Sequence, residues 1–279
     1  MGSVSEIPFL PISMFRDHDI QTGDWRPEAI FRSSGTTRSV QSKHLISDAD
    51  WYHRVAEKTF GESFGHVSDY TWIGLLPSYL ERSDSSLIDM VHYFMHVDKK
   101  HESGFFPEIN DQLLDVLGKL SDKNQKTILI GVSFALLDLL EKFNVPVWAN
   151  LHVIETGGMK GRGKEITREE LHSRMRKKNP QLMIASEYGM TELLSQAYLL
   201  KDHFRPGSMV KIMTRDISDP MNILSFSQRG AINVIDLANL DTCSFIATDD
   251  IGIVYEDGSF DVLGRLDLSD VRGCNLLYA

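Results

Sequence analysis

The apolar positions of this chain change their spacing from one segment to the next. Apolar residues recur at helical spacing in 48–60 and 83–97, and an apolar helix is predicted to end near Phe143. Short apolar runs predict buried strands at 70–77, 126–131, 145–155 and 182–185. This alternation predicts an α/β domain with a mostly parallel sheet flanked by helices, in which a ligand binds at the carboxyl ends of the strands.

The pattern changes from Ser208 onward. Short β-like runs are separated there by turns such as Asp257-Gly258, which predicts an antiparallel β-rich subdomain. We therefore expect an α/β core over 1–207 and a β-rich C-terminal subdomain over 208–279. The opening segment 7–12 carries spaced prolines and predicts an extended lead-in.

Composition narrows the class of protein. With 279 residues and 42% hydrophobic content, the chain can bury a sizeable core. A net charge of −10 argues against a nucleic-acid partner, and the basic cluster at 174–178 is typical of a solvated helix end. No apolar run approaches the roughly 18 residues of a membrane-spanning helix. The 2 cysteines are too few for a disulfide scaffold and agree with a reducing cytoplasm.

A Ser/Thr/Gly loop is the first of three polar segments that suit a nucleotide. It follows a β-like pair and consists of Ser33, Ser34, Gly35, Thr36 and Thr37. Hydroxyls and backbone N–H groups around one glycine can wrap phosphate oxygens, because glycine allows close approach and unusual backbone angles. Such a loop is more often an ordinary surface turn, so composition alone leaves both interpretations open.

The second segment follows the apolar run at 182–185 and reads Tyr188, Gly189, Met190, Thr191 and Glu192. An aromatic ring, a tight turn, a hydroxyl and a carboxylate in five successive positions could stack a base, contact a phosphate and hold Mg²⁺ through oxygen. A strand followed by a helix N-terminus would also favour Thr and Glu here. The two interpretations are compatible.

The third segment contains Asp249 and Asp250 after Thr248, followed by a Gly-Arg-Leu-Asp run that includes Arg265. Carboxylates at a strand end can accept hydrogen bonds from the two hydroxyls of a ribose, and an arginine beyond them can support the sugar or phosphate. Taken singly, this segment is also compatible with a pair of β-turns that carry solvated charges.

The order of these motifs resembles the adenylate-forming superfamily of acyl-CoA synthetases, peptide-synthetase adenylation domains and luciferases. The Ser/Thr/Gly loop is followed by Y-G-x-T-E, then by T-x-D and then by G-R-x-D. The resemblance implies the large-domain fold of these enzymes, ATP and Mg²⁺ as cofactors, and activation of a carboxylic acid as an acyl-adenylate. It implies phosphate contacts from the loop, adenine contacts from Gly157, Gly158 and Tyr188, and a nucleotide-binding role for Gly189. It also implies catalytic roles for Thr191 near the α-phosphate and Glu192 on Mg²⁺, and ribose contacts from Asp250 and Arg265.

Within this superfamily the chain is most similar to the acyl-protein synthetase branch, which activates a fatty acid for bacterial bioluminescence and passes it through a cysteine. The similarity rests on the segments 7–11, 155–160 and 272–277. The branch ends without the lid domain that supplies a catalytic lysine elsewhere in the superfamily, and it carries a cysteine near the C-terminus. Cys274 matches that cysteine and is the implied acyl acceptor, although a free cysteine is often a small core residue. Cys243 lies in an apolar run and is interpreted as core.

Two departures from the family pattern keep alternatives open. Arg38 stands where the family loop usually has glycine, so it either pairs with phosphate or obstructs the loop. The region before the loop is also shorter than in the relatives. The alternatives are a ligase that hands the acyl group to CoA or a carrier protein, and a nucleotide- or acyl-binding protein without catalysis. The expected partners are a small-molecule carboxylic acid and an acyl-accepting reductase or carrier, and a homo-oligomer is compatible with the sequence.

Two further patterns are not interpreted as sites. His92 and His96 lie four apart on a predicted helix, but no glutamate between them and no nearby cysteine completes a metal-binding pattern. An amphipathic helix is the preferred interpretation. The segment 161–164 resembles part of a phosphate loop, but it lacks the preceding strand and the Ser or Thr after its lysine that a Walker motif requires.

Overall fold

The protein divides into two compact units that do not follow the order of the chain. The computed structural model describes residues 6–34, 41–77, 84–146, 148–157, 166–178, 180 and 182–266. Unit 1 comprises residues 1–48, 191–195 and 203–279, and unit 2 comprises residues 49–190 and 196–202. The short segment 191–195, which contains Thr191 and Glu192, therefore belongs to unit 1 although the chain on both sides of it belongs to unit 2.

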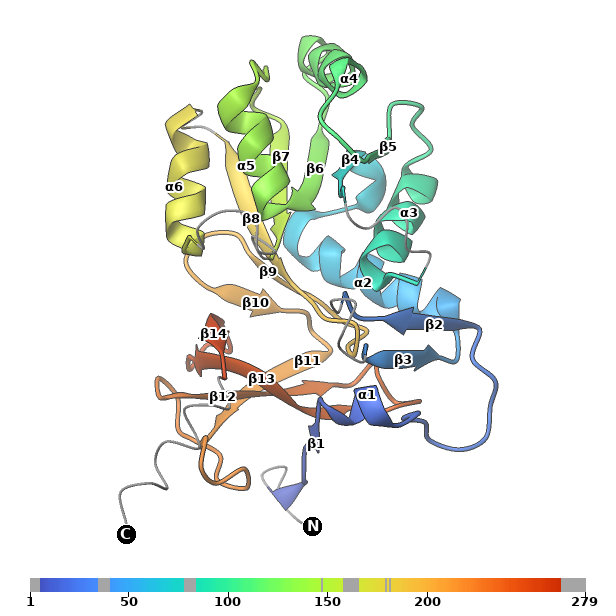
Figure 1. The fold of residues 1–279 in the computed structure, drawn as a ribbon, viewed down its shortest axis with the longest axis vertical. Helices are drawn as coiled ribbons and strands as arrows, with labels where there is room; N and C mark the ends of the chain where they lie inside the picture. The colour runs from blue at the N-terminus through green and yellow to red at the C-terminus, as the bar shows by residue number, and fades with distance from the viewer. Residues whose placement is uncertain are drawn as a thin grey trace. The chain divides into compact units, whose positions relative to one another are not determined.

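Unit 2 is built on a sheet in which parallel strands predominate, with the order β9-β8-β7-β6-β4-β5 (Figure 1). Its strands are β4 (Thr71–Leu75), β5 (Gly104–Phe106), β6 (Thr127–Val132), β7 (Leu151–Thr156), β8 (Met183–Tyr188) and β9 (Ala197–Leu199). Only β9 runs antiparallel to its neighbour within this set. Strands β4 and β6 are buried along their whole length, as expected for parallel strands that are covered on both faces.

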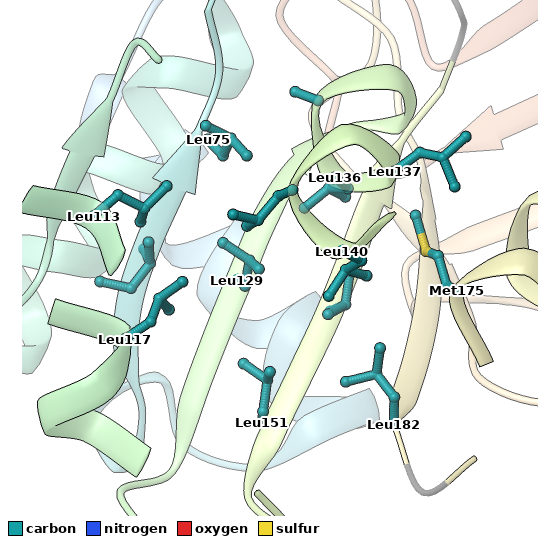
Figure 2. Packing of buried hydrophobic residues seen from close by; sticks show 14 of the residues in the cluster. Leu75, Leu113, Leu117, Leu129, Leu136, Leu137, Leu140, Leu151, Met175 and Leu182 are labelled. Carbon is teal, nitrogen blue, oxygen red and sulfur yellow. The ribbon is translucent and has the colours of Figure 1, made fainter. Parts of the chain in front are cut away.

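Helices cover both faces of this sheet. They are α2 (Ala49–Phe64), α3 (Ser86–Asp98), α4 (Asp111–Asp122), α5 (Ser133–Lys142) and α6 (Arg168–Lys178), with a short 3-10 helix η2 at Val67–Asp69. On one face, leucines of α4 and α5 and Met175 of α6 pack with strand residues such as Leu129 and Leu151 (Figure 2). On the other face, the Trp72 ring lies 4.9 Å from Phe60 of α2 and 4.8 Å from Phe94 of α3, measured between ring centroids. Each face thus has its own apolar layer.

Helix α4 is not among the elements predicted from the apolar pattern. Asn110 caps it by accepting a hydrogen bond from the backbone N–H of Leu113 at 3.0 Å. Leu113, Leu117 and Leu120 recur at intervals of four and three and are all buried. The sequence therefore contained two signals for a helix in this segment, an N-cap residue and leucines at helical spacing.

Unit 1 is mainly antiparallel. Its sheet has the order β11-β12-β13-β14-β10, and β1 pairs with β13 in the parallel direction. The strands are β1 (Leu10–Pro11), β10 (Phe204–Pro206), β11 (Val210–Arg215), β12 (Arg229–Asp236), β13 (Phe245–Val254) and β14 (Phe260–Arg265). A separate hairpin pairs β2 (Ala29–Arg32) with β3 (Lys43–Ile46), and a short helix α1 (Met14–Asp17) follows β1. The predicted turn at Asp257-Gly258 joins β13 to β14, and Gly258 supplies the positive φ of 80°.

Most predicted elements are present with small shifts of their ends. The helices predicted over 48–60 and 83–97 are α2 and α3, and the antiparallel region after Ser208 contains β11 to β14. The strand predicted over 145–155 is shorter and begins at Leu151. None of the helices in the described ranges has the length and apolar character needed to cross a bilayer.

The core between α4, α5 and the sheet generates a stability prediction. Leu117 is 0% exposed, so Leu117→Ala removes buried methyl groups and leaves a cavity that rigid neighbours cannot fill. We expect urea unfolding to show a loss of about 2–5 kcal/mol. The matched control Leu240→Ala, at a side chain that is 65% exposed, should cost less than about 0.5 kcal/mol. Equal losses in the two variants would contradict this assignment of the core.

Candidate functional site

The Ser/Thr/Gly loop connects β2 to β3 in unit 1, and its base is closed by hydrogen bonds. The backbone N–H of Ser33 donates to the carbonyl of Ser42 at 3.0 Å, and the Ser33 hydroxyl accepts from the Ser42 N–H at 3.0 Å. Ser33 is half-buried and Ser34 is exposed. Gly35, Thr36 and Thr37 lie outside the described residues, as does Arg38. The two strands therefore present the start of the predicted phosphate loop from a paired hairpin.

The Glu192 carboxylate lies at the base of this loop. Its side chain is buried, and burial raises the pKa of the carboxyl group. The Ser42 hydroxyl donates a hydrogen bond to it, and this bond together with the positive charges of Arg265 and Arg16 partly offsets the effect of burial on the pKa. Two of the three sequence motifs thus meet within unit 1.

The third motif is also in unit 1. Asp250 and Arg265 are directly opposite each other in the register of β13 and β14. The Arg265 Nε lies 3.5 Å from an Asp250 carboxylate oxygen, and the Arg265 side chain is 85% exposed whereas the Asp250 side chain is 11% exposed. The guanidinium group is therefore available to a ligand, and it exerts its charge on both Asp250 and Glu192.

The backbone of Thr191 to Ser195 is held by polar side chains that the sequence motifs did not include. Three residues contact this segment and are at most 1% exposed: His44 of β3, Asp236 at the end of β12, and Asn239 three residues later. A histidine on the apolar side of a strand and an Asp-x-x-Asn turn after another strand were the only sequence signals. Neither resembles a known ligand motif.

Unit 2 contains the other candidate residues, at the carboxyl ends of β7 and β8. These strands are parallel neighbours with Thr156 in register with Glu187, so Gly157 and Tyr188 follow at the same edge. Tyr188 is half-buried, and Gly157 is exposed with open space where a β-carbon would point. Gly189 differs, because a β-carbon there would collide with the carboxyl group of Glu187. A side chain at position 189 would therefore require the Glu187 carboxyl group to move.

Two carboxyl groups near this edge have pKa values that are shifted in opposite directions. Burial would raise the pKa of Glu155, but hydrogen bonds from His172, Ser186 and Ser133 together with the charge of Arg168 lower it overall. Glu187 projects from the opposite face of the sheet. Burial, and then the negative charge of Glu155, raise its pKa to about 7. Glu187 has no recognisable pattern in the sequence, because a single glutamate beside a motif carries no signal.

The remaining candidates lie apart from these groups or outside the described residues. Gly158 and Cys274 are outside the described ranges. Cys243 is half-buried, donates to the carbonyl of Phe245 at 3.3 Å, and has a thiol pKa raised by burial. His92 and His96 are both exposed on α3. Among the described residues, no three His, Cys, Asp or Glu side chains are grouped so that they could hold a metal ion by themselves.

No family model matches the sequence, and no curated protein is significantly similar to it. Solved structures are similar in fold. ATP-bound MatB from Rhodopseudomonas palustris aligns with a TM-score of 0.61 at 19% identity, over 88% of this chain and 49% of that chain. O-succinylbenzoate coenzyme A synthetase from Bacillus subtilis, in complex with ATP and magnesium ion, aligns with a TM-score of 0.61 at 18% identity, over 85% of this chain and 49% of that chain.

A long-chain-fatty-acid-CoA ligase from Archaeoglobus fulgidus aligns with a TM-score of 0.61 at 14% identity, over 89% of this chain and 53% of that chain. The chain thus spans about half the length of the solved structures that it matches. These similarities confirm the predicted fold class, which is a mixed α/β fold with a mostly parallel sheet flanked by helices and an antiparallel β-rich C-terminal part, as in these solved enzymes.

The raised pKa of Glu187 generates a prediction about stability and pH. The folded protein holds this proton until about pH 7, whereas the unfolded chain releases it near pH 4.5, so ionisation weakens folding as the pH rises between these values. Glu187→Gln removes this effect. We expect the variant to gain about 2 kcal/mol relative to wild type between pH 5 and pH 8, as measured by urea unfolding. The exposed control Glu256→Gln should show no such gain, and a pH-independent difference for Glu187→Gln would contradict the prediction.

Proposed function

We propose that this protein activates a carboxylic acid with MgATP to form an acyl-adenylate, and that the acyl group then passes to a cysteine thiol. The observation that carries the proposal is the grouping within unit 1. The base of the Ser/Thr/Gly loop, the Glu192 carboxylate and the Asp250–Arg265 pair are linked by Ser42 and by the charge of Arg265. These are the segments whose order resembles the adenylate-forming superfamily. The fold is also shared with structures solved with ATP or AMP.

The residues suit a nucleotide bound with one divalent cation. Mg²⁺ is commonly held by one or two carboxylates together with substrate phosphates. Glu192 is a buried carboxyl group whose charge is only partly compensated by Ser42 and the arginines, so a cation would stabilise its ionised form. When bound, Mg²⁺ would neutralise phosphate charge. Asp250 would accept hydrogen bonds from the ribose hydroxyls, and Arg265 would approach the sugar or phosphate from its exposed position.

In the first step, the substrate carboxylate attacks the α-phosphorus of ATP, a carboxylate–phosphorus bond forms, and pyrophosphate leaves. Thr191 would contact the α-phosphate, and the hydroxyls of Thr36 and Thr37 would hold the other phosphates. Gly157, Gly158 and Tyr188 are the proposed adenine contacts, and Gly189 is a further residue proposed to bind the nucleotide. Catalysis would consist mainly of positioning and charge stabilisation.

In the second step, the Cys274 thiolate would attack the acyl carbonyl, a thioester would form, and AMP would leave with the electron pair of the broken bond. The support for this step is the sequence resemblance to acyl-protein synthetases. A second acceptor is favoured by the structural neighbours, because O-succinylbenzoate coenzyme A synthetase and the long-chain-fatty-acid-CoA ligase are named for coenzyme A. An external thiol, from coenzyme A or a carrier protein, is therefore the alternative.

The adenylation step predicts a reaction that can be measured directly. Wild-type protein should catalyse exchange of labelled pyrophosphate into ATP that depends on an added carboxylic acid. Glu192→Gln should lower kcat by on the order of 10²-fold, because it removes the negative charge that would hold Mg²⁺. It should not lower stability, since burial already disfavours the ionised carboxyl group in the absence of metal.

Glu169→Gln, at an exposed position of α6, is the matched control and should leave exchange unchanged. If a panel of fatty, aromatic and short acids supports no exchange with wild-type protein, adenylation is wrong. If exchange is present and Glu192→Gln retains full activity, the role given to Glu192 is wrong.

The thioester step predicts a covalent label from radioactive acid that neutral hydroxylamine removes. Cys274→Ser should lose this label because the thiol is the acceptor, and Cys243→Ser should keep it because the Cys243 thiol is half-buried and donates to a backbone carbonyl. Intact-protein mass spectrometry after turnover measures both. Equal labelling of wild type and Cys274→Ser would eliminate Cys274 as the acceptor.

A further inference from the structure

The backbone of the segment 191–195 is largely buried but lies outside any strand or helix. It follows β8 along the chain, yet it groups with unit 1, and none of its residues is in a strand or a helix. Leu193, Leu194 and Ser195 are buried. Buried backbone N–H and C=O groups must find partners, so this segment depends on side chains for them.

Asp236 provides partners for two of these N–H groups. One of its carboxylate oxygens accepts from the N–H of Leu194 at 2.9 Å and of Ser195 at 3.0 Å, and the other accepts from the Ser195 hydroxyl at 2.8 Å and the Ala238 N–H at 3.1 Å. Burial raises the pKa of Asp236, and these donors partly counter that effect. A carboxylate that is 0% exposed is thus fixed by four donors, three of which belong to Leu194 and Ser195.

His44 and Asn239 hold the carbonyl groups at the other end of the segment. The Asn239 side-chain amide donates to the carbonyl of Glu192 at 2.9 Å. The His44 Nδ1 lies 2.7 Å from the carbonyl of Thr191. A carbonyl oxygen can only accept, so the proton must be on Nδ1.

The second nitrogen of His44 joins these partners together. The His44 Nε2 lies 3.1 Å from the Asn239 side-chain oxygen and 3.0 Å from the Thr242 hydroxyl. Burial lowers the pKa of His44 to about 4, which outweighs the hydrogen bonds with Thr191 and Asn239, so the ring is neutral at pH 7. Neutral Nε2 can only accept, and the single proton of the Thr242 hydroxyl is shared between Nε2 and the Asn239 side-chain oxygen, which lies 2.5 Å from that hydroxyl. The Phe15 ring packs edge to face against the imidazole, with the ring centroids 5.6 Å apart.

The short segment 42–44 contacts both the start of the Ser/Thr/Gly loop and the Thr191–Glu192 backbone. Ser42 binds Ser33 at the base of the Ser/Thr/Gly loop and donates to Glu192, and two residues later His44 holds the carbonyl of Thr191. Residues 42–44 are therefore hydrogen-bonded both to Ser33 and to the Thr191–Glu192 segment.

We infer that His44, Asn239 and Asp236 form a clamp of positioning residues that fixes the backbone of residues 191–195, so that the Thr191 hydroxyl and the Glu192 carboxylate are presented in one orientation for phosphate and metal. This inference rests on the proposed adenylation. The three clamp residues are buried and hold the segment mainly through its backbone atoms, so they act through Thr191 and Glu192 and not on substrate. A misplacement of a catalytic group by about 1 Å can cost on the order of 10²-fold in rate.

Two substitutions of the same residue separate positioning from general stability. His44→Asn places an amide donor where Nδ1 was and can keep the hydrogen bond to the Thr191 carbonyl. His44→Gln places its amide near the former Nε2 and loses that bond. Both replacements are neutral and polar, and His92→Gln on the exposed side of α3 is the control.

The first readout is amide hydrogen exchange of the peptide that covers 191–195, which requires no activity. We expect His44→Gln to speed exchange there by about 10-fold or more, whereas His44→Asn and His92→Gln stay near wild type. Exchange in β6, which is buried along its whole length in unit 2, should be the same in all four proteins. Unchanged exchange of 191–195 in His44→Gln would overturn the clamp.

The second readout is pyrophosphate exchange. We expect kcat of His44→Gln to fall by on the order of 10²-fold while KM for ATP changes by less than about 3-fold, and His44→Asn to recover most of kcat. Faster amide exchange together with a wild-type kcat would overturn the positioning role. Wild-type protein without any exchange of pyrophosphate would refute the proposed function, and the amide-exchange measurement would still decide whether the clamp exists.

Discussion

The candidate site depends on how the buried backbone between Thr191 and Ser195 satisfies its hydrogen bonds. This segment leaves a strand and groups with the other unit without forming regular structure, so it has no neighbouring strand to pair with. An unpaired buried N–H or C=O group costs about 1–3 kcal/mol, and several together would prevent this conformation. Asp236, Asn239 and His44 provide the missing partners. The position of Glu192 is therefore a consequence of side chains from other parts of unit 1.

The buried cation Arg215 also has hydrogen-bond partners, as a buried polar group requires. Arg215 of β11 donates to the carbonyls of Ile232 and Thr248, both at 2.8 Å, and to the side chain of Asn233 at 2.6 Å. It thereby ties three strands together just before Asp250. A buried cation with carbonyl partners loses less free energy on desolvation than an isolated one, although burial still lowers its pKa. The hydrogen bond from Arg215 to the Thr248 carbonyl thus holds β13 two residues before Asp250.

The contrast between Glu155 and Glu187 shows how one sheet edge can hold two carboxyl groups of different character. Glu155 is in register with Ser186, and the next residue along β8, Glu187, projects to the opposite face of the sheet. Glu155 meets the donors His172, Ser186 and Ser133, which stabilise its charge. That charge then disfavours ionisation of Glu187. A neutral carboxyl group at the edge of β8 can donate a hydrogen bond near neutral pH.

The sequence by itself determined the fold class, because the period of apolar positions distinguishes buried strands from amphipathic helices over most of the chain. It also contained the residues of the candidate nucleotide site, since glycine, hydroxyl and carboxylate groups in a particular order indicate phosphate and ribose contacts. The apolar pattern did not lead us to α4 as a separate element, although Asn110 and the leucines that follow were present. Only the tertiary structure decided which residues meet. Ser42 is an ordinary polar residue in the sequence, and the pairing of β2 with β3 makes it the link between Ser33 and Glu192. His44 lies 195 positions from Asn239, and a local pattern cannot report such a contact. The role of His44 depends on which backbone groups are left unpaired after the strands have formed, and this is a property of the folded chain as a whole.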